Sequence, residues 1–139
     1  MMEFRGTDAV FESQIGVERI KQAVAAVLSL PPSRVSIIDN IADYPERASA
    51  DVVCLLTRTL GDFTLAVSIQ CDPVHISLSK ELDVVQRLVD ALGVAALTPD
   101  DSPLPTSMWF VSPNATPERV SVDDSALDDG RFEIRHAPR

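Results

Sequence analysis

Two strand-like runs, 51–60 and 63–71, constrain the fold more than any other feature of the sequence. Gly61 and Asp62 separate them, and glycine at the first central position is typical of a type II′ hairpin turn. The alternation predicts two antiparallel strands with one apolar face and one polar face. On the second strand, the apolar face consists of Phe63, Leu65, Val67, Ile69 and Cys71.

The same register predicts how the two cysteines lie. The turn places Leu60 opposite Phe63. Counting back along both strands, Cys54 then faces Ile69 and lies only diagonal to Cys71. A diagonal pair is too far apart for an unstrained disulfide, so we expect two buried core thiols rather than a redox pair.

An amphipathic helix is predicted before the hairpin. Ser13 is its candidate N-cap, and Pro31 and Pro32 end it because proline lacks the backbone N–H of a helical ladder. The apolar positions follow the helical period and comprise Val17, Ile20, Val24, Val27 and Leu28.

A second amphipathic helix is predicted over residues 80–92. Ser79 is its candidate N-cap, and Gly93 stands where a left-handed C-terminal cap is needed. The apolar face comprises Leu82, Val85, Leu88, Val89 and Leu92.

Short strands account for the rest of the regular structure. They are predicted at 34–39, 74–78, 94–97, 106–112, 119–122 and 131–135. The order predicts an α+β fold, an antiparallel sheet built from hairpins with two amphipathic helices packed on one face. A length of 139 residues fits a single domain over 1–139, and we expect residues 1–12 and 136–139 to fray.

The formal charge of −9 limits the partners of this chain. An acidic surface repels phosphate backbones and anionic lipids, so we expect neither nucleic acid nor a membrane as a partner. Two cysteines without a disulfide framework, and the absence of a signal-like N-terminal run, favour the cytoplasm. A basic protein is the partner that the charge favours, with the chain itself a monomer or a homodimer.

The sequence contains no recognisable catalytic or cofactor motif. His75, with Asp72 nearby in sequence, is the one candidate acid-base pair. Cys71 completes a zinc-compatible trio with them, but a structural zinc site needs four ligands, and we therefore predict no metal and no cofactor. A surface histidine is the simpler interpretation of His75.

Acidic residues concentrate in one part of the chain. Residues 100–130 hold seven acidic residues and one basic residue. If the loops that carry them meet at one end of the sheet, their field would steer a basic partner; otherwise they are solvated turn residues. The only tryptophan is either an interface anchor or part of the core. The candidate partner-binding residues are Asp100, Asp101, Asp123, Asp124, Asp128, Asp129 and Trp109.

The second half of the chain resembles small acidic bacterial immunity proteins over about residues 80–135. The similarity lies in the segments Leu92-Gly93, Leu97-Thr98-Pro99-Asp100-Asp101, Met108-Trp109-Phe110-Val111-Ser112-Pro113-Asn114, Val120-Ser121-Val122-Asp123 and Leu127-Asp128-Asp129-Gly130. The resemblance implies a cytosolic, non-catalytic inhibitor that binds a cognate toxin domain and blocks its active site. It assigns a role to no individual residue.

The predicted element order is also similar to that of type III secretion chaperones. Those proteins are acidic, of this size and usually dimeric, and they bind a segment of an effector protein along their surface. Residues after Asp129 are too few for the C-terminal helix expected of that class. The chain is therefore predicted to be an immunity-type inhibitor of a basic toxin or effector domain, with a secretion-type chaperone as the alternative and a small enzyme using His75 and Asp72 third.

Overall fold

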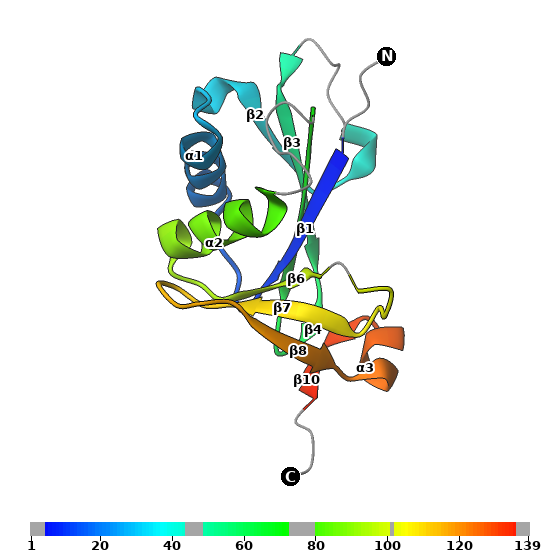
Figure 1. Ribbon diagram of the computed structural model, residues 1–139. Coiled ribbons are helices and arrows are strands. Elements are labelled where there is room, and N and C mark those ends of the chain that lie inside the picture. Colours follow the sequence, from blue (N-terminus) through cyan, green and yellow to red (C-terminus); the bar gives the residue numbers. More distant parts are fainter. Residues whose placement is uncertain (1–4, 44–48, 73–79, 101, 136–139) are drawn as a thin grey trace.

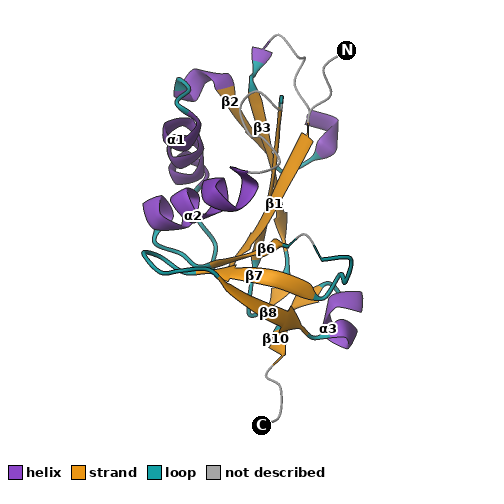
Figure 2. Ribbon diagram, viewed as in Figure 1, coloured by secondary structure: helices purple, strands orange, loops and turns teal. Residues whose placement is uncertain are grey.

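The computed structural model describes residues 5–43, 49–72, 80–100 and 102–135 of the chain. More of these residues lie in strands than in helices. The two long helices lie together (Figures 1 and 2). The elements are β1 Arg5–Phe11, α1 Val17–Leu28, η1 Pro32–Arg34, β2 Val35–Ile38, η2 Ile41–Asp43, β3 Val52–Arg58, β4 Leu60–Gly61, β5 Leu65–Cys71, α2 Glu81–Leu92, β6 Ala96–Pro99, β7 Ser107–Val111, β8 Glu118–Val122, α3 Asp124–Asp128, β9 Arg131–Phe132 and β10 Ile134–Arg135.

The main sheet has eight strands in the order β10-β8-β7-β6-β1-β5-β3-β2. All neighbours are antiparallel except β2 and β3, which pair in parallel. The predicted α+β class with a mostly antiparallel sheet is confirmed, and the parallel pair β2–β3 is the one departure from antiparallel pairing in this sheet. Arg34 holds the parallel pair at its start, because its guanidinium donates to both carboxylate oxygens of Asp51 and its carbonyl accepts from the Asp51 N–H.

The expectation that residues 1–12 fray is wrong for Arg5–Phe11, which form strand β1. It lies in the middle of the sheet between β5 and β6 (Figure 1), and its seven residues all pair with β5. Thr7, Ala9 and Phe11 alternate along it and are buried. The intervening Asp8 is exposed on the other face. Burial from both neighbouring strands stabilises a segment whose own sequence is only partly apolar.

The predicted hairpin register is confirmed. Cys54 pairs with Ile69, and Leu65, Val67, Ile69 and Cys71 are all buried. The turn is wider than the predicted two residues, because the backbone N–H of Thr59 donates to the Thr64 carbonyl. Leu60 therefore does not join the core.

Strand β4 consists of Leu60, predicted as the end of the first strand, and Gly61, predicted as a turn residue, and it pairs in parallel with β9. Leu60 is exposed as a result. Gly61 has a φ of +93°, and a Cβ there would lie 2.8 Å from the carbonyl oxygen of Phe132. Glycine is thus required by this strand contact rather than by a type II′ turn.

Helices α1 and α2 pack on one face of the sheet, as predicted (Figure 2). The guanidinium of Arg19 donates to the carbonyl of Leu92 at 2.8 Å and so ties α1 to the C-terminal end of α2. Together with the facing strands they enclose the principal core, to which the helices contribute Ile20, Ala23, Val24, Ala25, Val84, Val85, Leu88, Val89 and Leu92.

The ends of the helices differ in part from the prediction. Helix α1 begins after Gly16 without a side-chain cap, so Ser13 is not its N-cap, and Val17 at its first position is 54% exposed. Gly93 ends α2 in the left-handed conformation, as predicted. The predicted strand 74–78 and the candidate cap Ser79 lie outside the described residues.

The opposite face of the sheet carries a second, smaller core. Its buried residues are Val10, Phe63, Leu97, Met108 and Val122. Leu127 and Phe132 pack against it from α3 and β9. The β7–β8 hairpin that supports it is as predicted, with Asn114 at a positive φ in its turn. Helix α3 was not predicted.

Candidate partner-binding surfaces

The two acidic segments of the sequence meet at one end of the sheet. Because β7 and β8 are antiparallel, the loop that enters β7 and the segment that leaves β8 lie side by side. The backbone N–H of Val122 donates to the carbonyl of Thr106 at 2.8 Å and joins them. We call the described residues of 100–107 and 122–129 the α3 end of the molecule (Figure 1).

The structure buries the side chain of Asp100, which was predicted to be a partner-binding acid. Its side chain is 0% exposed. One carboxylate oxygen accepts from the hydroxyl of Ser107 at 2.5 Å, and the other accepts from the backbone N–H of Ser102 at 2.9 Å. Donors from the same loop and from β7 thus turn this carboxylate inward.

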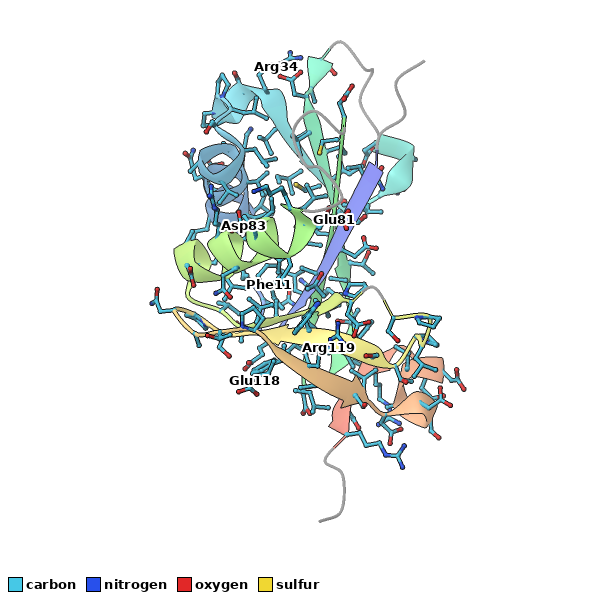
Figure 3. The ribbon with its side chains drawn as sticks, viewed as in Figure 1. Phe11, Arg34, Glu81, Asp83, Glu118 and Arg119 are labelled. Carbon is cyan, nitrogen blue, oxygen red and sulfur yellow. The ribbon has the colours of Figure 1, made fainter. Side chains whose placement is uncertain are left out.

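Arg119 connects Asp100 with Trp109. Its Nε lies 3.9 Å from a carboxylate oxygen of Asp100, and its guanidinium carbon lies 4.7 Å from the centre of the Trp109 ring. Trp109 is half-buried and also packs against the principal core. Arg119 lies on β8 (Figure 3), and its side chain is 59% exposed. A guanidinium stacked on an aromatic ring is favourable and is oriented in advance for a further contact.

Asp123 and Asp124 are not turn residues. The Asp123 carboxylate accepts from the backbone N–H of Ala126 and caps α3, and Asp124 occupies the first turn. Asp124, Asp128 and Asp129 are exposed. Asp129 also forms an ion pair with Arg131 at 3.4 Å. The acids that remain available to a partner at the α3 end are therefore these three.

Other predicted site residues cannot be placed. Asp101 and His75 lie outside the described residues. Asp72 directly follows β5 and is half-buried, so the proposed acid-base pair has only one described member.

The two cysteines are free and buried, as predicted. Burial, with a smaller contribution from the neighbouring Cys71, raises the pKa of the Cys54 thiol to about 12. A thiol with such a pKa is protonated at neutral pH and is a poor nucleophile.

A cleft that the sequence analysis did not anticipate lies on the face of the sheet that carries α1 and α2. Strands β1, β2 and β3 all run in the same direction, because β1 and β3 are each antiparallel to β5 and β2 is parallel to β3. Their carboxyl ends therefore meet at one edge of the sheet, where α1 begins. Crevices at such edges commonly bind ligands in sheets of parallel strands.

The cleft has a volume of about 900 Å³. Its walls come from the β1–α1 connection, the ends of β2 and β3, the start of β5 and η2. The apolar lining residues are Ile15, Val17, Ile37, Ile38, Leu56 and Leu65. The charged lining residues are Asp39, Asp43 and Arg58.

The sequence contained only part of the signal for this cleft. The carboxyl ends of β2 and β3 come together only when these strands are parallel, and local alternation does not distinguish parallel from antiparallel pairing. Recognition of β1 would have revealed a strand–helix–strand unit, for which parallel strands are the rule.

Among the described residues, no group of three or more metal-binding side chains occurs, and no described helix is long and apolar enough to cross a membrane. The chain matches no protein-family model, and no similar curated protein or solved structure was found.

Proposed function

We propose that the protein is a non-catalytic, cytoplasmic protein-binding module that inhibits a basic toxin or effector domain, in the manner of an immunity protein. The observation that supports this proposal is the α3 end, where a five-residue helix carries Asp124, Asp128 and the following Asp129 on an exposed surface. These carboxylates are part of the acidic excess that gives the chain a formal net charge of −9. Such a surface accelerates association with a basic partner and repels acidic competitors.

The Trp109–Arg119 pair supports the same proposal. Tryptophan and arginine are the residue types most enriched among those that contribute most to protein–protein affinity. The buried Asp100 carboxylate fixes Arg119 before a partner arrives, so less side-chain entropy is lost on binding. Acids at the α3 end would then govern the rate of association, and this pair would govern the lifetime of the complex.

The proposal is tested by comparing what three forms of the tagged chain capture from a native lysate at low salt. The first is the unmodified protein, and the second carries Asp124→Asn, Asp128→Asn and Asp129→Asn. The third is a charge-matched control with Glu12→Gln, Glu18→Gln and Asp83→Asn, which are exposed residues of other elements. Asp123 is left unchanged because it caps α3.

We expect the unmodified and control forms to capture one basic protein in equimolar amount, released by moderate salt, and the α3 variant to capture much less of it. Inhibition of that protein's activity by the unmodified chain would support the inhibitor function. Equal capture by all three forms would remove the α3 end from the interface.

A second candidate function is that of a secretion-type chaperone, and the cleft at the carboxyl ends of β2 and β3 favours it. A chaperone holds an extended segment of its partner along apolar surface and is usually a dimer, whereas an inhibitor meets a folded domain. Light scattering during size-exclusion chromatography distinguishes a monomer from a dimer. Limited proteolysis of the captured partner shows whether the bound part is folded.

A further inference from the structure

The cleft at the carboxyl ends of β2 and β3 combines accessible apolar surface with charged groups. Val17 is 54% exposed, and Ile37 and Leu56 are only half-buried although they pack against the principal core. All three line the same cleft. Apolar side chains that come from a helix and from two strands, and that no described segment covers, provide a floor on which a partner's apolar side chains would be desolvated.

The charged groups of the cleft show which partner is complementary. Asp39, Asp43 and Arg58 are exposed lining residues. None of these three side chains forms a hydrogen bond or an ion pair with another described residue. Among the described lining residues, two carboxylates against one guanidinium make the cleft acidic, in a protein whose net charge is −9. Its electrostatic complement is a basic group next to apolar ones.

We propose that this cleft binds an extended polypeptide segment of the protein partner in which basic side chains alternate with apolar ones. The apolar side chains lie on Ile37, Leu56 and Val17, and the basic ones meet Asp39 and Asp43. A volume of about 900 Å³ is at the upper end of the range for binding clefts, which suits several consecutive residues rather than one inserted side chain. This inference rests on the proposed protein-binding function and adds a second contact, on the face of the sheet that carries α1 and α2, whereas α3 packs on the opposite face.

The test uses the full chain labelled with ¹⁵N and three synthetic peptides that differ only in charge. These are Ac-Leu-Lys-Val-Lys-Leu-NH2, its Glu counterpart and its Gln counterpart. Amide chemical shifts locate the binding site, and fluorescence anisotropy of dye-labelled peptides gives Kd. We expect the Lys peptide to bind most tightly and to shift amides around Ile37, Leu56 and Arg58.

Variants that change the charge of the cleft in opposite directions make the test more specific. Asp39→Asn with Asp43→Asn should raise the Kd of the Lys peptide by about tenfold, whereas Arg58→Gln should lower it by about twofold. Asp83→Asn with Glu118→Gln is the charge-matched control, and it should leave Kd nearly unchanged because neither residue lines the cleft. All these side chains are exposed, and dispersed amide spectra will confirm that each variant is folded.

Three results would overturn the proposal. The first is equal binding of the Glu and Lys peptides, and the second is a set of amide shifts centred on α3 rather than on the cleft. The third is that hexylamine at the same concentration reproduces the Lys-peptide shifts, which would mean that the cleft binds small amines. If the Lys peptide binds in the cleft but the α3 variant captures as much partner as the unmodified chain, only the proposed α3 interface is contradicted. If the α3 variant captures less partner but the Lys peptide does not bind in the cleft, only the cleft proposal is contradicted.

Discussion

Asp100 illustrates how one buried carboxylate organises an exposed surface. It accepts from Ser107 and from the backbone of Ser102, and it faces Arg119 over the Trp109 ring. A buried acceptor of this kind stabilises the loop before β7 and also sets the position of the residues that we propose for partner contact. The stability of the α3 end and its proposed function therefore depend on the same side chain.

Replacing Asp100 with Ala should lower the free energy of unfolding by about 2–3 kcal/mol, because the Ser107 hydroxyl and the Ser102 N–H lose their acceptor. Loss of the Arg119 contact should also change the fluorescence of Trp109, the only tryptophan. Urea unfolding followed by fluorescence measures both effects. The exposed Asp128→Ala variant is the control, with an expected change within about 0.5 kcal/mol. Equal stability of the two variants would contradict the role of Asp100.

Gly61 is needed for a close backbone contact. Gly61→Ala and Gly93→Ala both place a Cβ at a positive φ, but only at residue 61 would it meet backbone, 2.8 Å from the Phe132 carbonyl oxygen. We expect Gly93→Ala to cost about 1 kcal/mol and Gly61→Ala about 3 kcal/mol, because the latter also separates β4 from β9. Thermal unfolding of the two variants measures the difference. A smaller loss at Gly61 than at Gly93 would show that the β4–β9 contact is not needed.

Ionisation of the Cys54 thiol makes the free energy of unfolding fall as the pH rises through the alkaline range. Its pKa rises from an ordinary value of 9.0 to about 12 on folding, so the folded state retains a proton that the unfolded state loses. The resulting stability is fully present below pH 9 and is lost as the pH rises toward 12. Cys54→Ala should show a shallower decline of unfolding free energy over this window than the unmodified chain. The same slope in both proteins would contradict the burial of this thiol.

At the scale of elements, each helix is stabilised by burial of its apolar face against the sheet. Val89 of α2 is 0% exposed in the principal core, whereas Val17 of α1 is 54% exposed at the cleft. The same substitution, valine to alanine, should therefore cost about 2 kcal/mol at residue 89 and less than about 0.5 kcal/mol at residue 17. Denaturant midpoints measure both. Similar losses would mean that α1 packs differently at its first turn.

Elements with a complete local pattern could be predicted from the sequence. The hairpin register that pairs Cys54 with Ile69 follows from the position of the turn and the alternation over residues 63–71, and the end of α2 follows from Gly93. Strand β1 could not be predicted, because Asp8 and Gly6 interrupt its pattern and its burial depends on β5 and β6, which are distant in sequence. Helix α3 has only five residues, which is too few for a periodic signal.

The candidate site was predictable only in outline. Acidic composition indicated residues 100–130, and the sheet does bring the two acidic segments together. Whether a given aspartate points outward depends on which donors lie beside it. Ser107 and Ser102 turn Asp100 inward, and the N–H of Ala126 engages Asp123. The cleft depends on the parallel pairing of β2 with β3, which is a property of the assembled sheet.

At the scale of the whole molecule, the sheet separates two surfaces with different chemistry. The α3 end presents exposed carboxylates near a stacked Trp109–Arg119 pair, whereas the carboxyl ends of β2 and β3 present an apolar cleft with Asp39 and Asp43. A partner that contacts both surfaces would gain affinity from each contact. The central claim is that the α3 end is an electrostatic surface for protein binding.

The most direct test of that claim is the association rate with the captured partner, measured by stopped flow from low to physiological ionic strength. For the unmodified chain and the Glu12, Glu18 and Asp83 control, the account predicts a rate that falls steeply with salt. For the Asp124, Asp128 and Asp129 variant it predicts a rate about tenfold lower at low salt and a flatter dependence. Identical salt slopes for the two charge-matched variants would contradict the account, because net charge alone would then explain the attraction.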